Sequence, residues 1–323
     1  MMTSRLLRLA AAVLVYGGVA LSLPERSDAT RQEEPVRAAT APQADRVLWT
    51  ESGRWTRNLH VRSSRVDGGG VRRVYDRLRG STSALVPSPD GRQVAFVTCC
   101  RDVRPLLVVA PTTGGPALAP LADHPELEGV RGLGWSPDGQ RLAFTALVAE
   151  GEDLVASLWT VRLDGSDLEH VLTVGDVLGE EPLGLTGETT AWTRAGIFYT
   201  QGDALRLARD GTSEVVMRRV HGVSTSMDGR WLVLQRQRGL VSQTWVARTD
   251  LSRARKVLQW DLDGSRWAYR GVVANRDGSR LLAQRQDVRA GGPHHWIAWD
   301  TTNGPRSHEV LPVPEDTSVV AWQ

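Results

Sequence analysis

The sequence has 323 residues, which is enough for one large domain or for two domains of ordinary size. Lysine and arginine total 39 against 37 acidic residues, so the net charge is only +2. Nucleic acids and anionic membranes usually require a concentrated basic face on their protein partners. The composition therefore gives no reason to expect either partner, and we predict no nucleic-acid binding.

The N-terminal residues predict a signal peptide. Arg5 and Arg8 precede an uncharged run at 9–23, which is shorter than the roughly 20 residues of a spanning helix but suits a signal-peptide core. Ser27 and Ala29 are small residues that permit cleavage after Ala29. We expect a signal peptide at 1–29, a disordered linker at 30–45, and export to the periplasm, the cell envelope or the exterior. Membrane association is expected only if the signal peptide is not cleaved.

From residue 46 onward, the chain repeats a four-strand pattern with a period typical of β-propellers. The clearest unit predicts strands at 131–136, 140–147, 157–163 and 168–174. In its second strand, Leu142 and Phe144 face one way, whereas Arg141 and Ala143 face the other. Both faces of this strand can therefore pack against neighbouring blades.

The same pattern predicts four more complete blades. The preceding unit has strands at 83–88, 92–98, 104–111 and 116–122. The later units occupy 188–220, 221–260 and 270–313. The first of these is degenerate and aligns with the clearest unit through Trp192, which takes the place of Trp135.

The two ends of this region complement each other. Residues 317–323 form a first strand without its blade, and residues 46–76 supply a second, third and fourth strand without a first. Together they predict a sixth blade with 1+3 closure, which removes unpaired sheet edges. The expected fold over 46–323 is an all-β, six-bladed propeller.

A short turn follows the first strand in four blades. The clearest copy is Ser136-Pro137-Asp138-Gly139. The proline ring fixes its own φ near the value that the turn needs, and the Ser and Asp side chains can form hydrogen bonds with nearby backbone groups. The glycine can adopt a positive φ without strain. A catalytic residue is needed once, whereas this turn recurs, and its sequence does not complete the G-x-S-x-G motif of hydrolases. We interpret the following residues as structural: Ser88, Asp90, Gly91, Ser136, Asp138, Gly139, Asp228, Gly229, Asp277 and Gly278.

These turns resemble those of the TolB-like, or WD40-like (PD40), propellers of exported bacterial proteins. The resemblance rests on 88–91 and 136–139, on weaker copies at 227–229 and 276–278, and on the outer hairpin at 163–166. It implies the propeller fold, with a structural turn and with partners that dock on variable loops. The chain departs from eukaryotic WD40 repeats because it lacks their regular GH…WD pairing.

Few residues suggest a metal or a cofactor. Cys99 and Cys100 are adjacent, and we interpret them as buried thiols; a strained disulfide between them and a metal or redox role are the alternatives. The stretch 261–265 resembles the opening of a calcium loop but lacks the later bidentate glutamate. No P-loop, HExxH or paired CxxC motif occurs. We predict no cofactor and no metal site.

Propeller geometry gathers the loops between second and third strands, and those between blades, on the rim opposite the repeated turns. We call this surface the loop rim. Its predicted members are Trp55, Arg57, Arg101, Asp102, Arg104, His124, Glu126, Glu128, Glu150, Glu152, Asp153, Arg236, Arg238, Asp261, Asp263, Trp267, Arg285, Asp287, Arg289, His294 and His295.

The loop rim allows two interpretations. One is ordinary solvated surface charge. The other is that Arg101, Arg104, Arg285 and Arg289 bind a carboxylate-bearing partner, such as a peptide terminus or an acidic sugar, with the forked geometry of arginine. The paired histidines of this rim, His294 and His295, diverge on a strand, although one of them could act as a ligand or a base.

The expected function is non-enzymatic binding of a protein, peptide or envelope component through the loop rim. The alternative is a propeller enzyme of the lactonase, glycosidase or lyase type, with acidic residues and histidines at the channel mouth. A regulatory or sensing domain is a third interpretation. The fold alone does not separate them, since propellers host both binding and catalysis.

Overall fold

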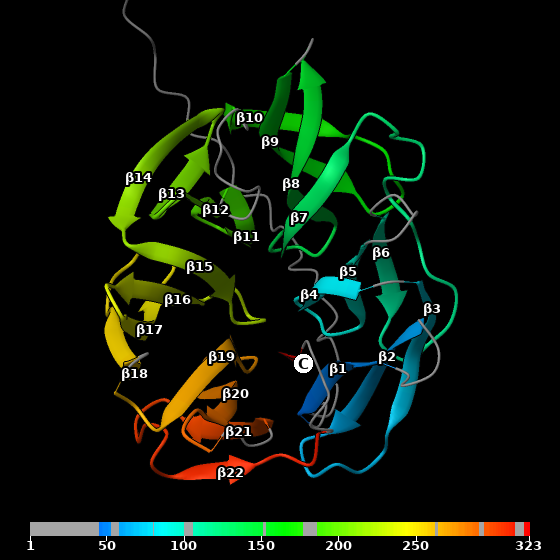
Figure 1. Cartoon of the computed structure of the whole chain (residues 1–323). Helices are drawn as coiled ribbons and strands as arrows, with labels where there is room; N and C mark the ends of the chain where they lie inside the picture. The colour runs from blue at the N-terminus through cyan, green and yellow to red at the C-terminus, as the bar shows by residue number, and fades with distance from the viewer. Residues whose placement is uncertain are drawn as a thin grey trace, which may run out of the picture. The chain divides into compact units, whose positions relative to one another are not determined.

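Six antiparallel sheets follow one another along the chain and around a common axis (Figure 1). The computed structural model describes residues 45–52, 58–79, 81–99, 106–150, 153–176, 186–261, 264–290, 294–313 and 320–323. These belong to one compact unit, Ala44–Gln323. Among the described residues, no helix has the length and apolarity needed to cross a membrane.

We number the sheets as blades 1 to 6 in chain order. Blade 1 contains β1 (Arg46–Ser52), β2 (Asn58–Arg65), β3 (Arg72–Arg79) and β23 (Val320–Trp322). Blade 2 contains β4 (Ser81–Pro87), β5 (Gln93–Cys99) and β6 (Leu106–Pro111). Blade 3 contains β7 (Glu128–Trp135), β8 (Arg141–Glu150), β9 (Asp153–Arg162) and β10 (Glu169–Asp176).

The second half of the ring follows the same order. Blade 4 contains β11 (Thr186–Thr193), β12 (Gly196–Gln201), β13 (Ala204–Arg209) and β14 (Thr212–Arg218). Blade 5 contains β15 (Val220–Thr225), β16 (Trp231–Arg238), β17 (Val241–Arg248) and β18 (Arg255–Asp261). Blade 6 contains β19 (Trp267–Ala274), β20 (Arg280–Asp287), β21 (His294–Asp300) and β22 (His308–Val310).

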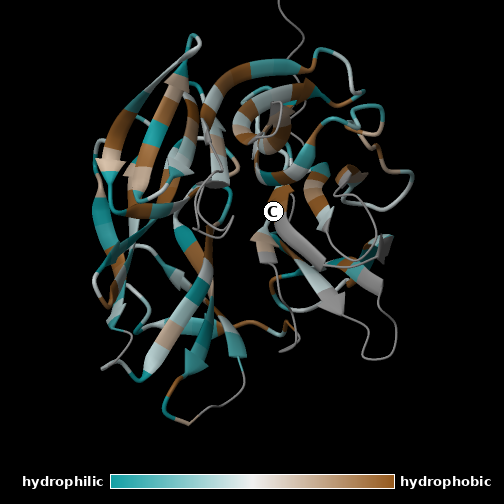
Figure 2. Ribbon diagram, turned by 45° about the horizontal axis from the view of Figure 1, so that its top comes forward, coloured by the Kyte–Doolittle hydropathy of each residue, from teal (hydrophilic) through white to brown (hydrophobic). Residues whose placement is uncertain are grey.

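The hydrophobic core lies between blades. Along the strands, apolar and polar residues alternate, as the brown and teal bands of Figure 2 show. On β8, Leu142 and Phe144 pack towards blade 2, whereas Ala143 packs towards blade 4. This confirms that the two faces of the strand are sandwiched by its neighbours. Because each blade buries both faces, stability depends on the whole ring.

Blade 2 differs from the prediction. The expected fourth strand at 116–122 is reduced to a single bridge, in which Val109 and Leu118 exchange backbone hydrogen bonds of 2.9 and 2.8 Å. Pro116 and Pro120 lie two residues on either side of Leu118. Proline has no N–H to donate to a ladder, so the pairing cannot extend through these two positions. The described part of blade 2 therefore has three strands.

Blade 1 combines residues from both ends of the described region. Strand β23 pairs antiparallel with β1, with Trp322 opposite Val47 and Ala321 opposite Leu48. The backbone N–H groups of Gln323 and Arg46 each donate to the other residue's carbonyl, at 2.8 and 3.1 Å. The sheet order is β23-β1-β2-β3, so β23 occupies the innermost position.

Candidate functional site

The Ser-Pro-Asp-Gly turn of blade 3 is a closed hydrogen-bonded unit. The Ser136 hydroxyl donates to the Asp138 carboxylate at 2.6 Å and accepts from the backbone N–H of Arg141 at 2.9 Å. The N–H of Gly139 donates to the Ser136 carbonyl at 2.8 Å, and Gly139 has a φ of +70°, which glycine adopts without strain. Ser136 is only 4% exposed. Its hydroxyl thus closes the turn, which supports the structural interpretation.

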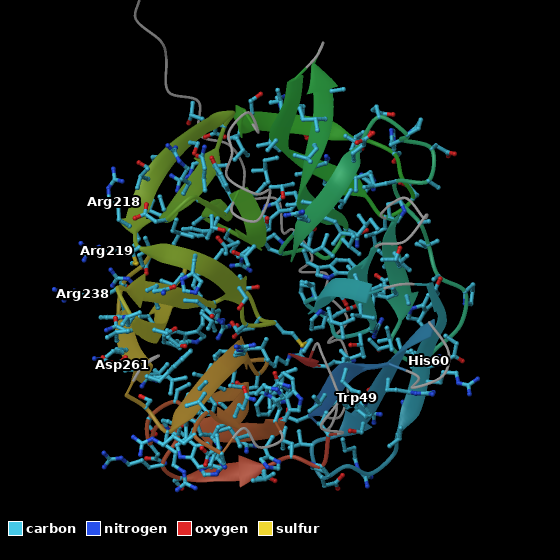
Figure 3. All side chains as sticks on the ribbon, in the orientation of Figure 1. Trp49, His60, Arg218, Arg219, Arg238 and Asp261 are labelled. Atoms are coloured by element: carbon cyan, nitrogen blue, oxygen red, sulfur yellow. The ribbon has the colours of Figure 1, made fainter. Side chains whose placement is uncertain are left out.

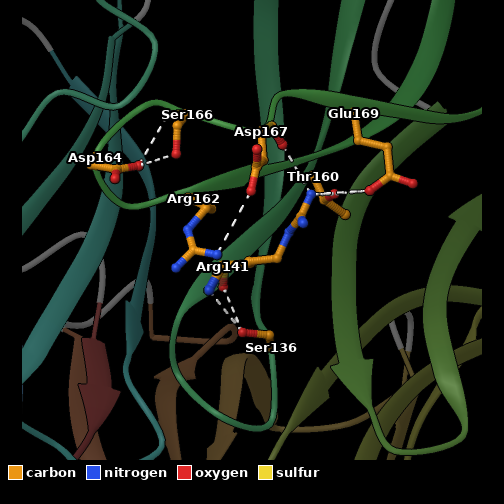
Figure 4. Close-up of polar contacts among 8 residues, drawn as sticks. All are labelled: Ser136, Arg141, Thr160, Arg162, Asp164, Ser166, Asp167 and Glu169. Carbon is orange, nitrogen blue, oxygen red and sulfur yellow. Dashed lines mark hydrogen bonds and ion pairs between the residues drawn. The ribbon is translucent and has the colours of Figure 1, made fainter.

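Arg141 ties this turn to the outer part of the same blade (Figure 4). Its guanidinium donates to the Thr160 hydroxyl at 2.7 Å and to the Glu169 carboxylate at 3.0 Å. Its backbone N–H bonds Ser136, so one residue joins the inner turn to β9 and β10. The polar groups around Ser136 therefore form a framework within the blade.

The other copies of the turn repeat these bonds. The equivalent serines of blades 2 and 5 donate to their aspartates at 2.6 Å in both cases. In blade 6, Asn275 replaces the serine, and its side-chain oxygen accepts from the N–H of Arg280 at 3.0 Å. An amide oxygen can replace the hydroxyl as the acceptor, so the copies share a structural requirement.

The inner strands enclose an axial channel that contains a cavity of about 460 Å³. Strands β4, β7, β11, β15, β19 and β23 contribute to its walls, so all six blades line it. The walls are mainly apolar and include Trp135, Trp192, Trp296 and Trp322. Residues of the repeated turns, such as Pro137, also border the cavity, which places it towards the turn end of the channel.

Direct contacts between blades hold the cavity walls in place. A Cβ atom at Gly134 would lie 2.9 Å from the backbone nitrogen of Trp192, so β7 and β11 approach through their backbones. The indole N–H of Trp135 donates to the Val86 carbonyl at 2.8 Å and links β7 to β4. Contacts between neighbouring blades therefore fix the cavity walls.

Polar groups are few among the described lining residues. The Thr190 side chain is 4% exposed, and its hydroxyl has no hydrogen-bond partner among those residues. Only His221 and Asp228 are ionisable among these lining residues; His221 is the second residue of β15, and Asp228 lies in the turn that follows this strand. Desolvation by burial lowers the pKa of His221, although the residue as a whole is exposed.

Arg285, one of the predicted loop-rim residues, lies in a cluster on blade 6. It faces His295 across β20 and β21. Its guanidinium stacks over the Trp267 ring at 4.3 Å and donates to Nε2 of His308 at 2.9 Å. The Nδ1 atom of His308 bonds the Pro305 carbonyl at 2.9 Å, which suits the neutral tautomer with its proton on Nδ1. The structure thus brings Arg285 and His295 together.

Arg289 and His294 are placed differently. The Arg289 guanidinium donates to the Gly264 carbonyl at 3.2 Å. His294 begins β21 and lies opposite Gln286. The two described arginines of the predicted carboxylate site therefore have separate intramolecular contacts.

Several predicted residues lie outside the described residues. They include Arg101, Arg104 and Cys100, whereas Cys99 is described only as the end of β5. Residues 262–263 of the calcium-like stretch also lie outside. Within the described ranges, no group of three or more His, Cys, Asp or Glu side chains could hold a metal ion.

The cavity itself is a feature that sequence reasoning missed. That reasoning placed the binding surface on the loop rim, whereas the described cavity lies towards the repeated turns. His221 and Trp192 carry no motif, and they stand out only as a histidine and a tryptophan in first strands of blades. The role of the loop-rim residues stays a prediction.

Comparisons with known proteins agree with the fold. No family model matches the chain, and no curated protein matches its sequence. TolB from Acinetobacter baumannii superposes with a TM-score of 0.64 and 15% identity over 86% of this chain, which spans only 66% of the TolB chain.

Two other solved structures are similar. A chain of the nidogen/laminin complex has a TM-score of 0.57 and 11% identity, over 86% of this chain and 98% of that chain. Oligogalacturonate lyase in complex with manganese has a TM-score of 0.52 and 13% identity, over 78% of this chain and 70% of the lyase chain. Identities this low bear on the fold alone. The described part of the chain is a six-bladed β-propeller with a TolB-like fold.

Proposed function

We propose that this protein is an exported, non-enzymatic propeller that binds a segment of a protein or peptide in its axial channel. The cavity of about 460 Å³ carries the proposal. Ligand sites in proteins typically have volumes of about 300–1,000 Å³, mostly apolar walls and a few placed polar groups. Export rests on the sequence of the N-terminal segment alone.

The chemistry of the walls favours an apolar peptide segment. Among the tryptophans and prolines of the lining, Trp192, Pro89 and Pro137 keep exposed surface, whereas the other three tryptophans are at most 5% exposed. Grooves lined by aromatic residues are a recurring way of binding extended peptides. The nidogen/laminin neighbour is a complex between proteins, which is consistent with a binding role for the fold.

The carboxylate site on the loop rim remains a second proposal for the same function. Its described arginines, Arg285 and Arg289, already contact Trp267 and the Gly264 carbonyl. A partner would have to share or displace these contacts. The preformed cavity requires no such rearrangement, so we favour the channel.

The enzymatic alternative would use ionisable groups at the channel mouth. His221 and Asp228 are the described candidates, and β15 separates them. At about 3.3 Å per residue, the length of this strand keeps their side chains from converging on one reacting atom. The proximity that acid–base catalysis needs is therefore not met by this pair.

We also propose that the 1+3 closure keeps the channel intact. The pairing of β23 with β1 supports this, because β23 forms part of both the innermost wall and the blade 1 sheet. A ring closed by backbone hydrogen bonds has no free edge at the junction of its ends.

A channel-blocking variant tests the proposal. Random 12-residue peptides displayed on phage are selected on the wild-type protein and then measured against Ser224→Trp, which fills the cavity from β15. The control is Ser252→Trp, an exposed position in the outer hairpin of the same blade. We expect apolar peptides whose binding is lost in Ser224→Trp and kept in Ser252→Trp. Equal binding to both variants would contradict the channel as the site.

A further inference from the structure

The charge of the propeller is unevenly distributed. Residues 186–261, which form blades 4 and 5, contain 12 arginine and lysine residues and 7 aspartate and glutamate residues, a net charge of +5 (12 minus 7). The whole chain has a net charge of only +2. A local excess of this kind attracts anionic partners and raises their association rate.

Three arginines of this region project from one outer edge of the molecule. Arg218 ends β14, Arg219 leads into β15, and Arg238 ends β16. Figure 3 shows their side chains following one another along the edge, with Asp261 as the acidic neighbour at its far end. We call Arg218, Arg219 and Arg238 the arginine edge.

The arginine edge has no charge partner within the described ranges. All three side chains are exposed, and none forms an ion pair with a described carboxylate. Elsewhere in the ring, Arg266 pairs with Asp287 at 2.7 Å and Arg280 with Glu309 at 2.8 Å. The positive charge of the edge is therefore left for an external partner.

The backbone beneath the arginine edge is held in place. The guanidinium of Arg236 donates to the Arg218 carbonyl at 3.4 Å, and the N–H of Gln237 donates to the Arg219 carbonyl at 3.3 Å. Arg219 has a φ of +61°, a conformation that is uncommon for residues other than glycine. Arg236 also stacks over the Trp245 ring at 5.2 Å. These contacts fix the strand ends, which lowers the ordering cost of binding.

Exposed apolar residues lie close to the arginines in sequence. Leu240 lies two residues after Arg238 in the β16–β17 turn and is 52% exposed, and Val215 on β14 is 39% exposed. Arginine together with exposed apolar residues is typical of protein interfaces. A polysaccharide of pure carboxylate and hydroxyl character would leave these apolar groups without a partner.

We propose that the arginine edge is a docking surface for an acidic segment of a partner protein, a segment that also carries apolar residues. This surface is separate from the axial channel and adds a second contact to the proposed peptide binding. The carboxylates of the partner segment would pair with the guanidinium groups, and the apolar residues of that segment would cover Leu240 and Val215.

The test uses a fluorescent 15-residue peptide of repeated Glu-Glu-Leu and measures its affinity for the full chain by anisotropy. We expect binding that weakens as salt rises. The triple variant Arg218→Ala, Arg219→Ala and Arg238→Ala should weaken it roughly tenfold. The control variant Arg72→Ala, Arg92→Ala and Arg276→Ala removes the same charge from exposed positions on other blades and should change the affinity less than about twofold.

Three outcomes would overturn the proposal. Equal losses in the two triple variants would mean that only net charge matters. If the Glu-Glu-Leu peptide does not bind the wild-type protein, the arginine edge is not a peptide-binding site. Binding of the wild type to phosphatidylglycerol vesicles or polygalacturonate, but not to the peptide, would assign the edge to a membrane or a glycan. Ser224→Trp should bind the acidic peptide as the wild type does, which separates this result from the channel proposal.

Discussion

The side-chain amide of Gln323 donates hydrogen bonds to the Gly91 carbonyl and, at 3.1 Å, to the Thr112 hydroxyl. Gly91 belongs to the repeated turn of blade 2, whereas Gln323 directly follows β23 of blade 1. The Thr112 hydroxyl itself bonds the Gly91 carbonyl at 3.0 Å. Residues from the end of the described region thus connect the first two blades, and the stability of the ring should depend on them.

Trp322→Ala should destabilise the protein strongly. Trp322 is 1% exposed and packs between blades 6 and 1. Truncation of a buried tryptophan typically costs about 3–5 kcal/mol of unfolding free energy, and urea denaturation would measure it. Val310→Ala, at a strand residue that is 55% exposed, should change the free energy by less than about 0.5 kcal/mol. Equal effects of the two changes would argue against the closure.

Ser136→Ala should reduce stability by about 1–3 kcal/mol, because the backbone N–H of Arg141 loses its buried acceptor. Thermal and urea unfolding would measure the loss. Ser166→Ala removes a hydroxyl that also bonds an aspartate, at 2.7 Å, but in an exposed hairpin, and it should cost less than about 0.5 kcal/mol. A Ser136→Ala protein of unchanged stability would contradict the structural role of this residue.

The repeated turns should make stability fall in acid. Hydrogen bonds, chiefly from the Ser136 and Ser279 side chains, lower the pKa of Asp138 and Asp277 below the ordinary value. As the pH falls through about 4, the unfolded chain therefore takes up protons before the folded chain does, and unfolding becomes easier. Above that range both states are ionised, and the stabilisation is fully present.

The double variant Asp138→Asn and Asp277→Asn should show a weaker dependence on pH. Asparagine keeps a side-chain oxygen acceptor in the turn but does not titrate. Urea midpoints at pH 7, 5 and 3.5 would give the slope for each protein. An unchanged slope in the variant would mean that other carboxylates dominate acid unfolding.

His221 should titrate at a lower pH than an exposed histidine. Desolvation lowers the pKa of its imidazole, so the folded protein keeps it neutral at pH values where the unfolded chain is protonated. As the pH falls below about 6.5, this group therefore favours unfolding. NMR titration of the ring resonances would measure the midpoint. A midpoint at or above about 6.5 would contradict the desolvated position in the channel.

The propeller was predictable because its repeat is visible in the chain. The turns around Asp138 and Asp228 mark the same position in different blades, and the alternation at Leu142 and Ala143 assigns the two faces of a strand. The fourth strand of blade 2 was predicted wrongly, because its apolar residues fit the pattern while Pro116 and Pro120 remove the donors that a ladder needs.

The cavity was not predictable in the same way. An apolar residue that faces the channel, such as Trp192, has the same local pattern as one that packs between blades. Only the closed ring distinguishes the two, because the channel is formed by first strands that lie far apart in sequence. The backbone contact at Gly134 is likewise a consequence of blade packing and has no local signature.

Indole resonances offer the most direct test of peptide binding in the axial channel. The chain has 12 tryptophans, of which Trp135, Trp192, Trp296 and Trp322 line the cavity, whereas Trp267 lies in the Arg285 cluster. A peptide selected on the wild type would be titrated into labelled protein, with the indole signals assigned by Trp→Phe changes. We predict shifts of the cavity indoles and no shift of Trp267. A shift confined to Trp267 would contradict the channel and place binding on the loop rim.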